Sequence, residues 1–306
     1  MIIAVVVIVV AAGVGVGAYV ATRGGTGGGG GGGYKELTLD CPLPEVPLSV
    51  PRFKVVYRDV APEEIRGLAE GTFGFTGNLG EITDTENDVG CLYLYIEDSG
   101  QQLWLFSSGA IGYTSGKGGL SYIPENLPSY ERAKEIAENL MQKIEASELI
   151  PENYGVQFRD VGPAEISYIG GEQTIHSLSV GFDLLLNGVE TSGGDVHVRI
   201  GENGEILAFG GMWRRAEENG NTTITVTPQE AIETLESGRF SIVAGIPPEK
   251  AVIKSMELAY YIRSPFQKQD TLTLVYLFEI APIEEDGSEG ELYGEMVPAT
   301  DEPFTL

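Results

Sequence analysis

The first 22 residues contain no charged side chain, and after Arg23 the segment 24–33 is almost entirely glycine. An apolar helix of this length, rising about 1.5 Å per residue, spans the roughly 30 Å hydrocarbon core of a bilayer. A glycine run cannot bury enough apolar surface to offset its ordering entropy and behaves as a flexible coil. The sequence therefore predicts a transmembrane helix over 1–23, held in membrane lipid by residues 1–22. A polyglycine linker over 24–33 and a folded body from Tyr34 follow.

The side of the membrane that the body occupies depends on three further signals. Arg23 after the span favours the cytoplasm by the positive-inside rule. Two cysteines, Cys41 and Cys91, and a glycosylation acceptor at Asn221 favour an oxidising, extracytoplasmic compartment. We expect a single-pass cell-membrane protein with an extracytoplasmic body, in which Cys41 and Cys91 form a disulfide. A cleaved signal peptide, or two unrelated buried thiols, are the alternatives.

The charge of the chain excludes one class of partner. There are 45 acidic against 19 basic side chains, for a formal net charge of -26. A surface this acidic repels nucleic acids at long range, so no nucleic-acid partner is expected.

The same order of elements occurs three times in the body, over 34–126, 127–218 and 219–306. Each segment contains one predicted helix, which starts at Pro62, after Ser129 or after Thr227, and several strands with alternating apolar residues. The Thr227 start carries a capping box with Glu230. One helix on an antiparallel sheet, repeated, predicts an α+β fold of tandem helix-plus-antiparallel-sheet units.

The stretch GGDVHVRIGENGEILAFGGMWRRAEENGNTTITVTPQEAIETL over 193–235 resembles PepSY-type and propeptide-like domains. The segments ELAYYIR, LVYLFEIA and VPAT of the third unit are similar to the ends of YycH/YycI-type accessory proteins of membrane histidine kinases. The resemblance covers roughly 129–300 and includes the PepSY-like second unit. It implies a non-enzymatic role in binding, restraining or sensing another envelope or membrane protein. The long glycine linker departs from the kinase accessories.

One short motif is a possible contact with a partner. Trp213, Arg214 and Arg215 place two guanidinium groups beside an indole, a combination that suits a partner's carboxylate. The alternative is that Trp213 packs in the core and the arginines pair with the chain's own glutamates.

Other motifs could hold metal ions but are incomplete. His176 and His197, with Asp195 or Glu172, offer imidazole and carboxylate ligands, although a histidine on a strand is more often a half-exposed polar residue. The loop 84–90 has oxygen ligands at alternate positions but lacks the twelfth-position acid of a calcium loop. We therefore predict no catalytic, cofactor-binding or metal-binding residue.

These observations favour a membrane-anchored, extracytoplasmic binding or regulatory module without enzymatic activity. The alternative is a structural surface or filament subunit of pilin type, whose apolar N-terminal helix packs in an assembly. An enzyme that uses carboxylates of the second unit is a third hypothesis, which no recognisable catalytic motif supports.

Overall fold

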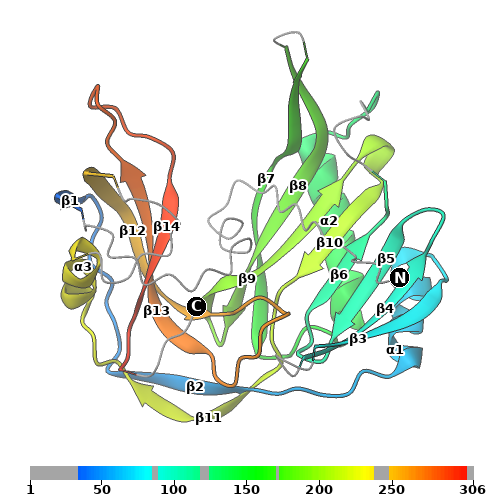
Figure 1. Cartoon of the computed structure of the whole chain (residues 1–306), viewed down its shortest axis with the longest axis horizontal. Coiled ribbons are helices and arrows are strands. Elements are labelled where there is room, and N and C mark those ends of the chain that lie inside the picture. Colours follow the sequence, from blue (N-terminus) through cyan, green and yellow to red (C-terminus); the bar gives the residue numbers. More distant parts are fainter. Residues whose placement is uncertain (1–33, 85–88, 118–123, 170–171, 238–247, 302–306) are drawn as a thin grey trace.

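The computed structural model describes residues 34–84, 89–117, 124–169, 172–237 and 248–301 (Figure 1). No helix among these residues is both long and apolar enough to cross a membrane. The predicted transmembrane segment 1–23 and linker 24–33 lie outside the described residues. The structure thus gives an N-terminal transmembrane helix no support, and the single-pass membrane assignment is withdrawn.

The helices begin where the sequence predicts. They are α1 (Pro62–Leu68), α2 (Tyr130–Ala146) and α3 (Pro228–Glu236), with a π-helical turn after α1 (Ala69–Phe73) and a 3-10 turn at Glu202–Gly204. Ser129 caps α2 by accepting from the backbone N–H of Arg132, and Thr227 and Glu230 form both bonds of the capping box of α3.

Strands make up most of the remaining described chain. They are β1 (Glu36–Leu39), β2 (Ser49–Val55), β3 (Asn78–Asp84), β4 (Val89–Ile96), β5 (Gln101–Phe106), β6 (Ile111–Thr114), β7 (Tyr154–Ile169), β8 (Glu172–Leu186), β9 (Val189–Ile200), β10 (Ile206–Gly211), β11 (Ala216–Thr223), β12 (Lys250–Tyr261), β13 (Thr273–Pro282) and β14 (Tyr293–Pro298). The predicted Asn187-Gly188 turn joins β8 to β9, and both residues have positive φ, as a type I′ turn requires.

Within the described chain, twelve of these strands form one mixed sheet, and β2 pairs with β11 in a second, two-stranded sheet. The prediction of tandem helix-plus-antiparallel-sheet units is therefore wrong. Strand β10 of the second predicted unit pairs with β6 of the first, and β9 of the second unit pairs in parallel with β12 of the third. Alternation of apolar residues specifies which side chains are buried, but it does not specify which strand lies alongside. The boundaries at 126/127 and 218/219 stay predictions.

The sheet divides at β9. Residues Glu190–Ser192 pair with β12, whereas Val196–Ile200 pair with β10 on the same side of the strand. Gly193 and Gly194 lie at the point of division. On one side of them the Ser192 carbonyl accepts a hydrogen bond from the N–H of Ile262, and on the other side the Asp195 carbonyl accepts one from the N–H of Met212. We call this point the fork. Strands β12–β14 form one arm beyond it, and β10, β6, β5, β4 and β3 form the other (Figure 1).

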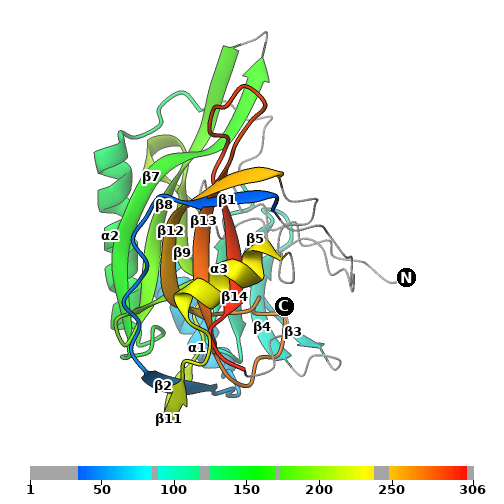
Figure 2. The same ribbon diagram turned by 90° about the vertical axis from the view of Figure 1, so that its left-hand side faces the viewer.

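The two faces of the sheet differ in what covers them. Helix α1 packs on β4 and β5, α2 on β7 and β8, and α3 on β14, all outside the curve of the sheet (Figures 1 and 2). The main core lies under them and includes Phe53, Leu105, Val198 and Tyr276, each at most 1 % exposed. We call this the covered face and the opposite one the open face, on which no described helix packs.

The fork yields the first test. Gly193 has φ of 75°, and a Cβ there would lie 2.3 Å from the carbonyl oxygen of Ile262. We expect Gly193→Ala to cost about 2–4 kcal/mol, from left-handed backbone strain and the clash together. Gly220→Ala is the control, since Gly220 has φ of 78° with open space around its Cβ position and keeps only the strain. Urea unfolding of both variants measures the difference, and equal losses would show that the fork tolerates a side chain.

Candidate functional site

One cross-strand row of residues runs over the open face from β3 to β7. Each member is directly paired with the next, across eight adjacent strands. The pairs are Gly80–Tyr93, Tyr93–Trp104, Trp104–Gly112, Gly112–Gly210, Gly210–His197, His197–Gly181 and Gly181–Asp160. We call these residues, with Arg159 beside Asp160, the transverse row. At about 4.8 Å per strand, its seven steps extend roughly 34 Å.

Planar side chains lie across the glycines of this row. A Cβ on Gly80 would meet the Tyr93 ring at 2.2 Å, and one on Gly112 would meet the Trp104 indole at 3.3 Å. Likewise, a Cβ on Gly210 would lie 2.2 Å from the imidazole of His197.

The far end of the row follows the same pattern. A Cβ on Gly181 would lie 2.5 Å from the guanidinium of Arg159. Glycine weakens a strand interior and often marks a position that another group must approach closely, while a ring packed over glycine recovers part of that loss. The row is thus a flat surface built from four glycines and four planar groups.

The aromatic end of the row is only half-buried. Tyr93 and Trp104 are partly exposed, and Tyr95 stands 5.5 Å from Tyr93 between ring centroids. Phe266, from the β12–β13 connection, is 39 % exposed and packs edge-on against Phe106 beside this end. Large apolar residues of the covered face, in contrast, are almost fully enclosed. Part of the surface of each of these rings therefore remains accessible.

The other end of the row is charged. Arg159 lies 3.0 Å from Asp183, 3.5 Å from Asp160 and 4.0 Å from Asp195, measured from nitrogen to carboxylate oxygen. Burial lowers the pKa of His197, while the nearby carboxylate of Asp195 acts in the opposite direction. Arg159 is thus shared by three carboxylates, and Arg199 on β9 adds a second positive charge near His197, so the carboxylates outnumber the guanidinium groups by three to two.

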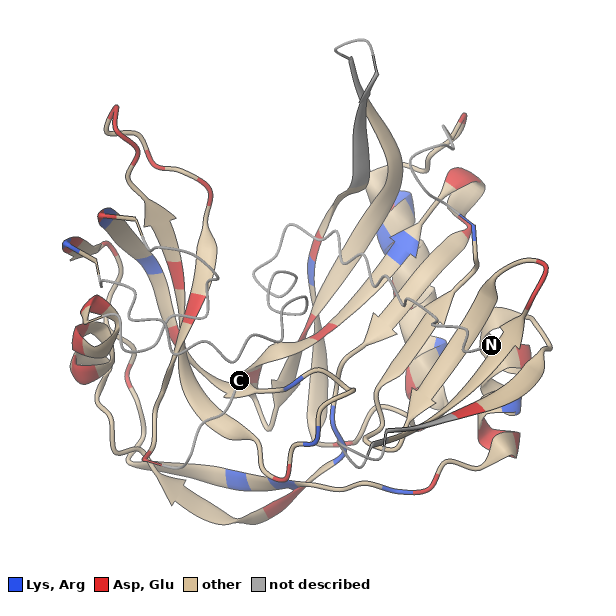
Figure 3. Cartoon of the chain, viewed as in Figure 1, with Lys and Arg blue, Asp and Glu red and all other residues tan. Residues whose placement is uncertain are grey.

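More carboxylates gather where β9 lies beside β12, on both sides of the fork (Figure 3). A hydrogen bond to Glu257, together with burial, raises the pKa of Glu190 to about 8, and the charges of Asp183 and Glu279 act in the same direction. Ser255 donates to Glu279 at 2.9 Å. The open face therefore concentrates like charge beside the transverse row.

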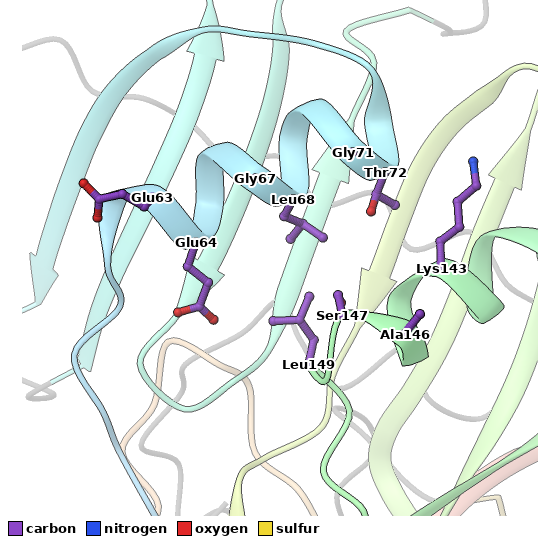
Figure 4. A pocket seen from close by; sticks show the side chains of 10 residues that line it. All are labelled: Glu63, Glu64, Gly67, Leu68, Gly71, Thr72, Lys143, Ala146, Ser147 and Leu149. Atoms are coloured by element: carbon purple, nitrogen blue, oxygen red, sulfur yellow. The ribbon is translucent and has the colours of Figure 1, made fainter.

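A groove lies on the other side of the molecule, between α1 and the end of α2 (Figure 4). It has a volume of about 480 Å³, and Glu63, Glu64, Thr72 and Lys143 line it with apolar and small residues. Glu64 accepts a 2.8 Å bond from Arg58, so part of its charge is already compensated.

The predicted disulfide is not formed, because Cys41 and Cys91 are both free thiols. Cys41 follows β1, which pairs with β12, whereas Cys91 lies in β4 on the other arm, with β9, β10, β6 and β5 between. That separation far exceeds the roughly 6 Å between Cα atoms that a disulfide spans. Burial raises the pKa of the Cys91 thiol to about 12, which leaves it unreactive at neutral pH.

The predicted partner contact is also corrected, because Trp213 and Arg214 are both 0 % exposed. Nη2 of Arg214 donates to the carbonyl oxygens of Arg263, Ser264 and Gln267 at 3.1, 2.6 and 2.9 Å. Arg214 thus fixes the β12–β13 connection from inside, and burial lowers its pKa. Arg215 is half-buried.

The two histidines do not meet. His197 pairs with Gly181 on β8, five residues along that strand from the buried His176. No group of three metal-ligating side chains is found among the described residues. The side chain of Glu172 and most of the calcium-like loop 84–90 lie outside what the structure describes. Asn221 is exposed on β11, and its glycosylation stays a prediction.

Sequence reasoning missed the transverse row. Gly80, Gly112, Gly181 and Gly210 are separated by 29 to 69 residues, and each interrupts a stretch with strand composition. Glycines inside such stretches are the only trace of the row in the sequence.

Comparisons with known proteins give no identity. No protein-family model matches the chain, and no curated protein does either. Among solved structures, an uncharacterized protein from Eubacterium rectale ATCC 33656 is similar with a TM-score of 0.48 and 10% identity, over 89% of this chain and 91% of that one. The Bacillus megaterium YpeB C-terminal domain is similar with a TM-score of 0.34 and 14% identity, over 78% and 99%. At such scores, neither likeness indicates a function.

The acidic cluster predicts a pH dependence of stability. The pKa of Glu190 is raised from 4.5 to about 8 in the folded protein, so the folded state holds this proton more tightly than the unfolded chain. The folding free energy that this proton contributes is fully present below pH 4.5 and is lost as the pH rises through about 8. Glu190→Gln cannot ionise, so its melting temperature should exceed that of the native chain by about 2–4 °C at about pH 9 and by much less at about pH 4.

Glu285→Gln is the matched control for this effect, since it removes an exposed carboxyl from the β13–β14 loop. Calorimetry at several pH values measures all three proteins. A gain for Glu190→Gln that is independent of pH would contradict the raised pKa.

The buried guanidinium predicts a second loss of stability. Arg214→Met keeps much of the side-chain volume but leaves three inward carbonyls without their shared donor, and we expect a loss of about 3 kcal/mol. Arg132→Ala, which breaks an exposed pair with Glu135 on α2, should cost about 0.5 kcal/mol or less. Urea unfolding compares the two, and a small effect at Arg214 would show that water replaces its bonds.

Proposed function

We propose that this protein is an extracytoplasmic, non-enzymatic binding module that regulates another protein by holding it on the open face. The observation that supports the proposal is the transverse row, with half-exposed rings of Tyr93 and Trp104 on a flat floor of glycine. Tyrosine and tryptophan are enriched at protein interfaces because they offer large contact areas at low entropic cost.

The extent of the row favours an extended ligand. It runs roughly 34 Å across the strands, which matches about ten residues of extended chain. A net charge of -26 disfavours a nucleic acid, although rings could stack on bases. A segment of another protein is therefore the ligand that we propose.

The extracytoplasmic location is part of the same proposal. It is supported by the exposed acceptor Asn221 and by a chain with 19 basic against 45 acidic side chains. The free thiols of Cys41 and Cys91 remove the argument that a disulfide would have added.

Site-specific photo-crosslinking in intact cells tests the proposal. A photoreactive residue at Tyr95, beside the row, should give a discrete adduct with a partner protein. The same residue at Tyr130, which is 47 % exposed on α2 of the covered face, should not. Trp104→Ala should lower the yield at position 95 by about tenfold, as expected when a central aromatic contact is lost. Equal adducts at both positions, or none at position 95, would contradict the assignment of the open face.

A further inference from the structure

We propose that the partner presents an extended, Lys/Arg-rich segment across the transverse row, with its cations on the rings of Tyr93 and Trp104 and against the carboxylates beside the fork. This inference rests on the proposed function and specifies the chemistry of the partner. The row supplies two kinds of cation site, aromatic rings at one end and carboxylates at the other.

The aromatic end suits cations because its rings present faces. Atoms of the Tyr93 ring lie close to Gly80 and one atom of the Trp104 indole lies close to Gly112, and both side chains are partly exposed. A Lys or Arg side chain placed over such a face is attracted by the ring quadrupole. Arg159 over Gly181 shows that the same surface already accommodates a flat guanidinium.

The charged end attracts cations because carboxylates are in excess there. Arg159 is shared among Asp160, Asp183 and Asp195, and its longest contact, to Asp195, is 4.0 Å. Farther along the open face, Glu257 adds negative charge, whereas Glu190, which forms a hydrogen bond with Glu257, is largely protonated at neutral pH because this crowding of carboxylates raises its pKa to about 8. An incoming ammonium or guanidinium group would relieve repulsion that the folded chain leaves in place.

Other ligands match only half of the row. An anionic polymer would be repelled by the carboxylates. An uncharged glycan could stack on Tyr93 and Trp104, but it would leave the charged end without a counterion. A basic peptide is complementary to both ends, and the negative charge of the chain would also accelerate its association.

Two labelled peptides of about ten residues, alternating Lys-Gly and alternating Glu-Gly, serve as probes, matching the length of the row. We expect fluorescence anisotropy to detect binding of the Lys peptide alone, weakening severalfold between about 50 and about 300 mM salt as screening increases. Trp104 reports on the same event through its emission, since Trp213 is fully buried.

Variants separate the two ends of the row. Trp104→Ala with Tyr93→Ala should weaken binding of the Lys peptide about five- to tenfold, whereas Trp104→Phe with Tyr93→Phe should retain most of it. Asp183→Asn with Glu257→Gln should weaken binding and flatten its salt dependence. Tyr130→Ala and Glu285→Gln are matched controls that leave binding unchanged, and circular dichroism confirms that every variant is folded.

Three results would overturn the inference. They are equal binding of the Lys and Glu peptides, no binding of the Lys peptide, or quenching of Trp104 by cellohexaose but not by the Lys peptide, which would favour a glycan. If the adduct at position 95 still forms while the Lys peptide fails to bind, the inference is wrong and the proposed function stands. If both fail, the open face is not a binding surface.

Discussion

The backbone of β9 at Gly193 and Gly194 is the constraint on which the rest of the structure depends. One strand edge pairs first with β12 and then, a few residues later, with β10. Such a change of neighbour needs a sharp departure of the chain, and the carbonyl of Ile262 lies where any side chain on Gly193 would be. Both arms of the sheet are joined there, so their relative placement follows from two residues that have no side chain.

The buried guanidinium of Arg214 also stabilises the β12–β13 connection. Arg214 lies between β10 and β11, and its Nη2 atom donates to three carbonyl oxygens of the β12–β13 connection. This side chain thereby links the end of β10, in one arm, to the β12–β13 connection of the other arm. Gln269, in the same connection, donates to the carbonyl of Tyr261 at 2.8 Å. A charged donor of this kind is costly to bury, and the three carbonyl oxygens that accept from Nη2 offset part of that cost, whereas Nε and Nη1 are buried without a hydrogen-bond partner among the described residues. Trp213 and Arg214, which the sequence suggests as a partner contact, are thus buried, and Arg214 stabilises the fold from inside.

The open face is what remains once the helices have covered the other side. Its transverse row depends on eight strands keeping one register, because a slip by one residue in any pair would turn that strand's planar group to the covered face. The fork places the carboxylates of β9 and β12 beside the charged end of the row. Aromatic rings and carboxylates therefore lie at opposite ends of one row on the same face of the sheet.

The sequence by itself determined the local elements. Pro62, Ser129 and the Thr227–Glu230 capping box mark the helix starts, and alternating residues identify most strands, because these signals act over a few neighbouring residues. Only the tertiary structure decided which strands are neighbours, that the thiols stay apart and that Gly80, Gly112, Gly181 and Gly210 meet in one row. The physical reason is that every strand offers the same backbone donors and acceptors. Side-chain patterns specify a face, whereas the choice of partner depends on packing of the whole sheet.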